Sequence, residues 1–273
     1  MEGPAPCVVC AVAADLAALD RPASDGAASS QLAARRRFLH EDFAGDGQHD
    51  AAEAMRRFLE RCVEADVRTG GRIPPPLLLD VEADSIVAGD SIPMGMLIGG
   101  DLHCQHCDRR WRAPSQALPL LPLHLVQWRG VGVEAALRHH FGVSFDLDAA
   151  FACSAADGGC GVRGQCRGRR AVLRWPPVLA LQLCRFNARL QRDDSPATLP
   201  EELDVGEGRC YTLRAVVEHR GSTVATGHYV AFTRADSAGP WLLHDDARDT
   251  AVPGGSAAQV LQAAYLCFYV RTT

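Results

Sequence analysis

A histidine and an aspartate that could act together in catalysis lie near the C-terminal end of the sequence, at positions 228 and 245. His228 opens an aromatic and β-branched run, residues 227–233, that is typical of a β-strand. Residues 234–240 end in Gly-Pro, which indicates a turn, and residues 241–244 then favour a returning strand. Because an antiparallel hairpin brings residues at equal distances from its turn side by side, we expect His228 and Asp245 to be neighbours.

An imidazole hydrogen-bonded to a carboxylate forms the base and the orienting acid of a nucleophilic catalytic triad. We expect the Nδ1 atom of His228 to lie roughly 2.6–3.2 Å from the Asp245 carboxylate. Asp246 is a second acid that could orient either His228 or a substrate. The same residues also fit a surface hairpin without chemistry, and a catalytic function requires a Ser or Cys from elsewhere in the chain.

The composition is that of an ordinary globular protein, with 273 residues of which 47% are hydrophobic and 22% are charged. A net charge of −5 and the absence of a basic stripe argue against nucleic acid as a partner. The first residues lack the positive segment of a signal peptide, and no apolar run approaches the ~18 residues that predict a membrane span. We therefore expect an intracellular protein of the cytoplasm or nucleus, whose 11 cysteines are reduced and available for metal binding or catalysis.

The elements that must position these groups are mostly strands. Asp50, followed three residues later by Glu53, predicts the start of an amphipathic helix at Ala51. Further helices are predicted at residues 6–20, 35–40 and 133–141, with a loop at 21–31. Strands are predicted at residues 96–103, 118–125, 175–186, 210–217 and 264–270, with 118–125 at a sheet edge and 175–186 in a buried position.

Motifs along most of the chain, roughly residues 43–271, resemble the ubiquitin-specific proteases, which are papain-like cysteine deubiquitinases. They occur in that family's order: Gln48-x-Asp50-Ala51-x-Glu53, Cys104-x-x-Cys107, Trp175 to Phe186, Tyr211-x-Leu213-x-Ala215-Val216-Val217, Gly227-His228-Tyr229 and Trp241-x-x-x-Asp245-Asp246. The resemblance implies an α+β papain-like fold in one domain, residues 1–273. Its parts are a helical thumb (1–95), zinc-tipped fingers (96–174) and a β-sheet palm (175–273).

The resemblance also implies a function: a thiol-dependent deubiquitinase that hydrolyses the bond after the C-terminal glycine of ubiquitin. His228 would be the triad histidine and Asp245 its acid, and the partners would be ubiquitin and ubiquitinated proteins. The loop bracketed by Gly221 and Gly227 would gate the channel for the terminal glycines of ubiquitin, although a plain hairpin turn also fits it.

The nucleophile departs from the family pattern, in which a cysteine opens a helix within a run like Gly-Asn-Thr-Cys-Tyr-x-Asn. No such run occurs here, and Cys7, which follows Pro6, is the best positional substitute, with Cys10 next. Residues 8–19 alternatively resemble the helix that follows the nucleophile in the family. The chain would then be a fragment without its nucleophile, or a catalytically inactive ubiquitin-binding relative. A zinc-dependent interaction domain is a further alternative, but it leaves the 227–246 hairpin unexplained.

A structural zinc site is expected from the cysteines of the fingers. Zinc takes four thiolates tetrahedrally, and a Cys-x-x-Cys spacing presents two of them to one ion. The resemblance implies a second pair, for which the spacing here is six residues where the family usually has two. Gly158-Gly159 lets this loop fold tightly, and Cys166 is the reserve fourth ligand. The predicted ligands are Cys104, Cys107, Cys153 and Cys160, and the alternative is a set of free thiols without metal.

Overall fold

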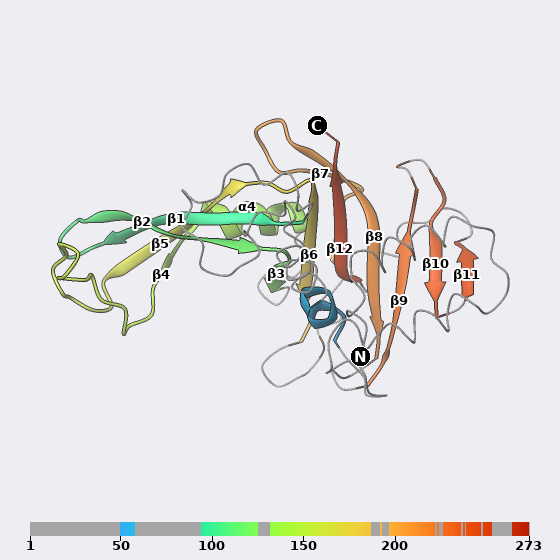
Figure 1. Ribbon diagram of the computed structural model, residues 1–273, viewed down its shortest axis with the longest axis horizontal. Coiled ribbons are helices and arrows are strands. Elements are labelled where there is room, and N and C mark those ends of the chain that lie inside the picture. Colours follow the sequence, from blue (N-terminus) through green and yellow to red (C-terminus); the bar gives the residue numbers. More distant parts are fainter. Residues whose placement is uncertain are drawn as a thin grey trace, which may run out of the picture.

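Two β-sheets make up most of the described chain, and one of them projects sideways from the other (Figure 1). The computed structural model describes residues 50–57, 94–124, 132–186, 192, 197–221, 223, 226–235, 237, 239–246, 248–252 and 264–272. The helices expected at 6–20 and 35–40, and both candidate nucleophiles, Cys7 and Cys10, lie outside these residues. The strand-rich architecture agrees with the predicted α+β fold class.

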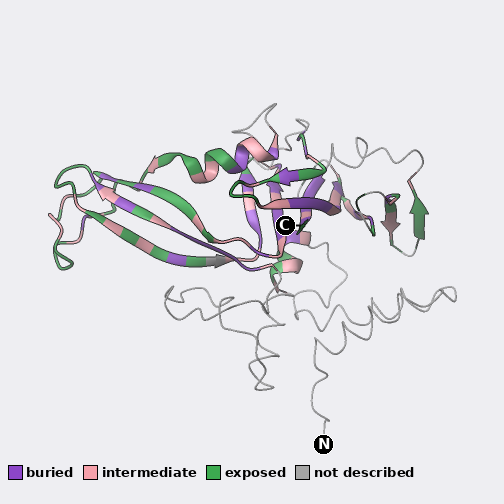
Figure 2. Cartoon of the chain, turned by 90° about the horizontal axis from the view of Figure 1, so that it is seen from above, coloured by how far each residue is buried: buried purple, intermediate pink, exposed green. Residues whose placement is uncertain are grey.

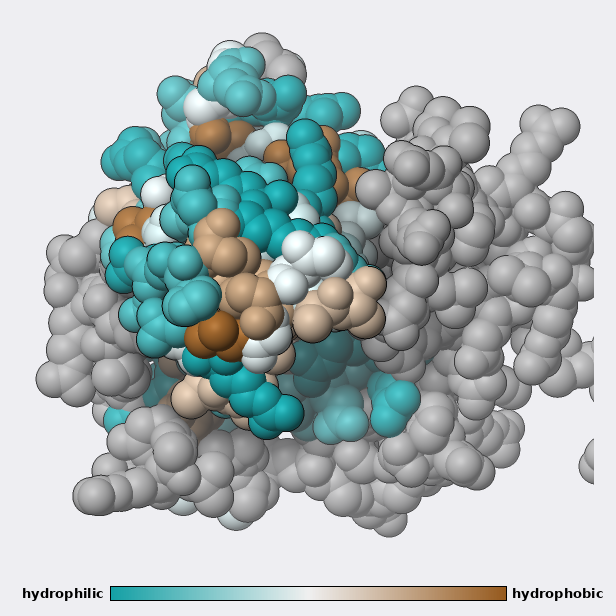
Figure 3. Space-filling view, turned by 90° about the vertical axis from the view of Figure 1, so that its left-hand side faces the viewer, coloured by the Kyte–Doolittle hydropathy of each residue, from teal (hydrophilic) through white to brown (hydrophobic). Residues whose placement is uncertain are grey.

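The projecting sheet has four antiparallel strands in the order β2-β1-β5-β4. They are β1 (Met96–Cys104), β2 (Arg110–Leu118), β4 (Ser144–Asp146) and β5 (Cys166–Arg174). Helix α4 (Val133–Gly142) contacts β5, and it matches the helix predicted at 133–141. Seen end-on, this part of the molecule presents hydrophilic residues around a central group of neutral to hydrophobic ones (Figure 3).

The larger sheet has eight strands, seven of them in the order β11-β10-β9-β8-β12-β6-β3, with β7 paired to β8. They are β3 (Leu121–His124), β6 (Val178–Cys184), β7 (Glu202–Asp204), β8 (Cys210–Arg220), β9 (His228–Thr233), β10 (Leu242–Asp245), β11 (Arg248–Ala251) and β12 (Ala264–Arg271). The strand β3 is an edge strand, as predicted, and it pairs with β6 in parallel. Residues 96–174 thus contribute strands to both sheets, and the division into thumb, fingers and palm stays a prediction.

One hydrophobic core joins the two sheets (Figure 2). In the large sheet, Leu181, Leu183 and Leu213 are fully buried, each contributing roughly 1.5–3 kcal/mol of transfer free energy. The same cluster includes Met96 at the start of β1 and Leu137 of α4, so the projecting sheet is anchored at its base. Strands β8, β9 and β10 therefore extend from a rigid platform.

The helix that begins at Ala51 is tied to this platform through its capping residue. The Asp50 Oδ1 atom accepts the backbone N–H of Glu53 at 2.9 Å, as predicted for an N-cap. Its other oxygen accepts the hydroxyls of Tyr265 at 2.5 Å and Tyr229 at 3.3 Å. Burial, followed by the Asp50 charge, raises the pKa of Tyr229 to about 12, so this hydroxyl stays a donor.

Within the described residues, no helix has the length and apolar composition needed to cross a bilayer.

Candidate active site and cysteine cluster

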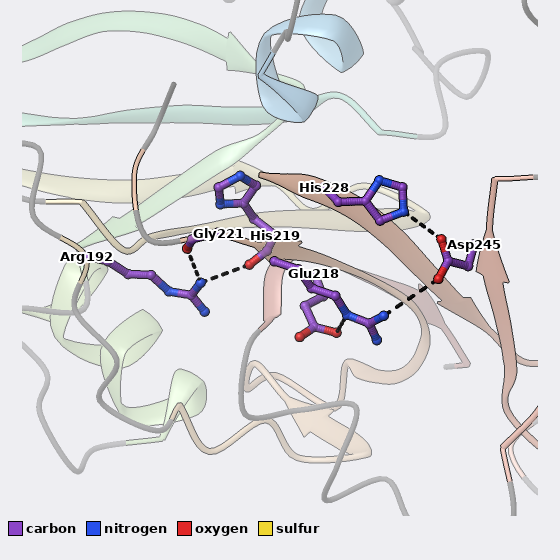
Figure 4. Close-up of polar contacts among 7 residues, drawn as sticks. Arg192, Glu218, His219, Gly221, His228 and Asp245 are labelled. Atoms are coloured by element: carbon purple, nitrogen blue, oxygen red, sulfur yellow. Dashed lines mark hydrogen bonds and ion pairs between the residues drawn. The ribbon is translucent and has the colours of Figure 1, made fainter. Parts of the chain in front are cut away.

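His228 and Asp245 lie side by side, at the first position of β9 and the last position of β10. The Nε2 atom of His228 is 2.6 Å from Oδ1 of Asp245 (Figure 4). The two side chains are 43% and 39% exposed, so a substrate has access to them. The imidazole–carboxylate pair expected from the hairpin is thus present in the structure.

The ring nitrogen in this contact differs from the expected one, and the Nδ1 prediction was wrong. The register aligns Leu242 with Thr233 and His244 with Ala231, so Asp245 lies diagonally across from His228 rather than directly opposite it. The carboxylate therefore meets the far nitrogen of the ring. With Nε2–H donating to Asp245, the lone pair for accepting a proton from a thiol is on Nδ1.

Asp245 has a second charged neighbour in Arg220. The Nη1 atom of Arg220 lies 3.8 Å from Oδ2 of Asp245, while its Nε donates to Oε2 of Glu218 at 3.2 Å (Figure 4). The two oxygens of Asp245 thus face different partners, the imidazole and the guanidinium. This arrangement holds the plane of the carboxylate in a defined orientation.

Asp246 occupies the turn that follows β10. Asp245 pairs with Arg248, which leaves a two-residue turn, and Asp246 has a left-handed φ of 52°. Its carboxylate lies within 4.8 Å of the His228 and Asp245 functional atoms, and it is exposed. Asp246 therefore stays available for the orienting role that the sequence predicts.

No cysteine of the described residues joins His228 and its carboxylates. Cys267 is fully buried, and burial raises its pKa to about 12. Burial likewise raises the pKa of Cys184 to about 11, so both thiols stay protonated and unreactive. The candidates Cys7 and Cys10 lie outside the described residues.

The glycines that bracket residues 221–227 pack against a buried histidine, His219. This residue is 4% exposed, and neither ring nitrogen has a hydrogen-bond partner in the described part of the chain. A Cβ on Gly227 would lie 2.2 Å from its Nε2, so only glycine fits beside the ring. Burial, followed by the charge of Arg192, lowers the pKa of His219 and favours its neutral form.

Four cysteine sulfurs converge at the far end of the projecting sheet. The Sγ atoms of Cys104 and Cys160 are 3.7 Å apart, those of Cys107 and Cys153 are 3.8 Å apart, and all four lie within 4.8 Å of one another. Four Zn–S bonds of ~2.3 Å in a tetrahedron require sulfurs about 3.8 Å apart, so the donor set fits zinc.

Glycines make the long spacing of the second pair possible. Gly158 and Gly161 have φ angles of 82° and 77°, and a Cβ on Gly159 would lie 2.5 Å from Sγ of Cys153. Cys166 was expected in the same loop, but it is the first residue of β5. It pairs with Cys104 across the strands and stands outside the group of four.

The thiols of this cluster have different proton affinities. The backbone N–H of Cys107 is the main reason that the pKa of Cys104 is lowered to about 6. The backbone N–H of Val162 acts to lower the pKa of Cys160, but burial and the other three thiols outweigh it and raise the value to about 11. A cluster that already favours thiolate at Cys104 suits metal binding, because thiolates are the ligands.

The α+β fold places an imidazole–carboxylate pair at the ends of two neighbouring strands, the arrangement of the base and the orienting acid in a hydrolase that uses a nucleophile. Residues 5–269 match the family model described as ubiquitin carboxyl-terminal hydrolase. The chain therefore belongs to the ubiquitin carboxyl-terminal hydrolase family, a family of cysteine-type deubiquitinases.

Known proteins similar to this chain include ubiquitin carboxyl-terminal hydrolase 23 of Arabidopsis thaliana, which is 26% identical over 97% of this chain and 30% of its own length. Ubiquitin carboxyl-terminal hydrolase 17-like protein D of Mus musculus is 35% identical over 36% of this chain and 19% of its own length. The chain thus spans less than a third of these relatives.

Solved structures with the same fold include a SAGA DUB module of Ubp8, Sgf11, Sus1 and Sgf73 bound to monoubiquitin. It has a TM-score of 0.74 and 20% identity, over 98% of this chain and 59% of that chain. The same four-protein module bound to ubiquitin aldehyde has a TM-score of 0.73 and covers 98% of this chain and 60% of that chain. At this identity the likeness establishes the fold.

Proposed function

We propose that this domain is a thiol-dependent deubiquitinase that hydrolyses the bond after the C-terminal glycine of ubiquitin, with ubiquitin and ubiquitinated proteins as its partners. The observation that carries the proposal is the 2.6 Å contact between His228 and Asp245 in a chain of this family. Solved relatives bound to monoubiquitin and to ubiquitin aldehyde support the choice of ubiquitin.

In the proposed reaction, a cysteine thiol transfers its proton to Nδ1 of His228, and the thiolate attacks the carbonyl carbon of the terminal glycine. The imidazolium then protonates the leaving amine, which leaves a thioester that water hydrolyses with His228 as base. Asp245 fixes the ring orientation and stabilises the imidazolium through Nε2–H. Cys7 is the candidate nucleophile of this chain.

A second candidate function, a non-catalytic ubiquitin-binding module, has its own support. The described residues bring no cysteine beside His228, and the sequence around Cys7 departs from the family motif. Such a module would keep the ubiquitin-binding surface of the fold and lack the covalent step.

A structural zinc ion is part of the proposal. Cys104, Cys107, Cys153 and Cys160 would hold it in a closed, four-coordinate site that supplies folding energy rather than catalysis. The cysteines of the described residues form no disulfide with one another, which supports the proposed setting in the cytoplasm or nucleus.

Hydrolysis and binding measured on the same preparations separate the two functions. The substrate is ubiquitin with a fluorogenic amide at its C-terminus, and ubiquitin itself serves for binding titrations. Hydrolysis by the wild type that is lost in His228→Ala, with ubiquitin binding retained, supports the enzyme. Binding without hydrolysis in both proteins supports the non-catalytic module, and no binding in either contradicts both.

A further inference from the structure

His228 stands at the end of a strand pair. Its Cα partner is Arg220, and this is the outermost pair of the β8–β9 ladder on that side. Strand ends open more readily than strand centres. A catalytic imidazole must be held within about 0.5 Å of its working position. Some contact must therefore secure this end of the ladder.

The guanidinium of Arg192 makes such a contact. Its Nη1 atom donates to the carbonyl oxygen of His219 at 3.0 Å and to that of Gly221 at 2.6 Å (Figure 4). These two carbonyls flank Arg220, the residue whose backbone pairs with His228. Hydrogen bonds from a charged donor are short and strong, so Arg192 fixes the β8 backbone on both sides of that pair.

The side chain of His219 is held at the same place. Phe186 forms an isolated β-bridge with Arg192, and its ring centroid lies 6.0 Å from that of His219 in an edge contact. On the other side, the ring of Tyr229 lies 4.7 Å from His219. Tyr229 is the residue after His228 and the cross-strand partner of His219. The main chain and the ring of His219 are thus both fixed, by Arg192 and by the two aromatic rings.

We propose that Arg192 is a positioning residue for His228, an inference that rests on the proposed function. It acts through the β8 backbone and not through the substrate. Arg192 donates to the backbone carbonyls of residues 219 and 221, which fixes the backbone of Arg220 between them. Arg220 is the cross-strand partner of His228, so its position determines where the imidazole contacts Asp245. Removal of the guanidinium lets the end of the ladder open, so the His228–Asp245 contact is populated less often.

The test compares the wild type with Arg192→Gln, Arg192→Lys and a matched control, Arg214→Gln. Arg214 lies on the same strand, and its Nε donates to the carbonyl of Arg234 at 3.2 Å, away from the His228 end. For each protein, amide hydrogen exchange is followed at residues 219–221 and 228–230, and kcat and KM are measured on the fluorogenic ubiquitin amide.

For Arg192→Gln we expect about tenfold faster exchange at residues 228–230 and about tenfold lower kcat, with KM within about twofold of the wild type. Arg192→Lys, which keeps the charge and one donor group, should recover part of both effects. Arg214→Gln should leave both near the wild-type values.

Unchanged exchange at residues 228–230 in Arg192→Gln would overturn the proposal. An equal loss of kcat in Arg192→Gln and Arg214→Gln, with faster exchange throughout the sheet, would also overturn it, because Arg192 would then serve stability alone. If the wild type hydrolyses no substrate, the proposed function fails, and the exchange data still decide whether Arg192 holds the His228 end of the ladder.

Discussion

At the residue scale, the proposed catalysis depends on one carboxylate oxygen and one ring nitrogen. Oδ1 of Asp245 holds Nε2 of His228, and Oδ2 faces the guanidinium of Arg220. The sequence predicts that His228 and Asp245 are neighbours, because they lie on either side of a turn. Which ring nitrogen contacts the carboxylate depends on the diagonal strand register, which no local sequence pattern encodes. The Arg220 contact also has no sequence signal, because it joins β8 to β10 across β9.

Replacement of Asp245 by asparagine tests its orienting role. The amide can still bond to the ring, but it favours the wrong tautomer, so we expect kcat to fall about 10²–10⁴-fold with little change in KM. The matched control is Asp249→Asn, because Asp249 Oδ1 also pairs with a histidine, His244 Nδ1, at 2.8 Å. Steady-state hydrolysis of the fluorogenic ubiquitin amide measures both. Equal activity of the two variants would contradict the assignment.

Gly227→Ala tests the packing of glycine against His219. The added Cβ would lie 2.2 Å from Nε2 of His219, so the ring or the loop has to move. We expect a loss of about 1–3 kcal/mol in the free energy of unfolding, measured by urea titration. Gly142→Ala is the control, because its Cβ would meet no atom of the described residues within 4 Å apart from its chain neighbours and its own helix backbone. A Gly227→Ala protein as stable as the Gly142→Ala protein would rule out this packing constraint.

At the element scale, the projecting sheet ends in the cysteine cluster, and Cys153→Ser tests whether this end is a zinc site. We expect elemental analysis to give about one zinc per wild-type chain and much less in the variant, since structural zinc needs four ligands. Hydrogen exchange should increase in β1, β2 and β5 and stay unchanged in β8 and β12. Cys166→Ser is the control, because Cys166 lies beside the group but not in it. Zinc-free wild type with four titratable thiols would contradict the site.

Helix α4 carries a pH-sensitive residue near its end. Burial, with smaller effects from Arg170, His124 and His139, lowers the pKa of His140 to about 4. In the unfolded chain this histidine has an ordinary pKa of about 6.5, so the unfolded state binds the extra proton first as the pH falls. The free energy of unfolding therefore decreases between about pH 6.5 and about pH 4.

His140→Gln should therefore lose less stability on acidification than the wild type, by on the order of 1–2 kcal/mol between about pH 7 and 4. Urea unfolding at the two pH values measures this difference. His139→Gln, at the exposed neighbouring position, is the control. Parallel pH dependence in the wild type and His140→Gln would disprove the role of burial at this histidine.

Several elements follow from local sequence, and others do not. The helix at 133–141 and the strands at 210–217 and 264–270, which are rich in aromatic and apolar residues, are present in the structure. The parallel pairing of β3 with β6 joins segments more than fifty residues apart, and nothing within either segment specifies that partner. The four cysteines converge because of left-handed glycines whose φ angles the sequence alone does not give.

At the scale of the whole molecule, one core connects the sheet that carries the four-cysteine cluster to the sheet that carries His228 and Asp245. Met96 and Ile98 of β1 pack in the same cluster as Leu181, Leu213 and Trp241. The order of family motifs predicts this architecture because each motif marks a strand or helix of the same fold. Arg192 belongs to no such motif, and its contacts with the carbonyls of His219 and Gly221 join positions 27 and 29 residues apart in the sequence.

The proposed deubiquitinase activity is tested with ubiquitin whose C-terminus carries a thiol-reactive electrophile. If the domain is a deubiquitinase that uses Cys7 and the His228–Asp245 pair, the wild type forms a covalent adduct that peptide mapping places on Cys7. The adduct should be absent in Cys7→Ser and strongly slowed in His228→Ala, because the imidazole no longer generates the thiolate. A wild type that binds ubiquitin but forms no adduct, or an adduct formed equally fast in His228→Ala, would contradict the account.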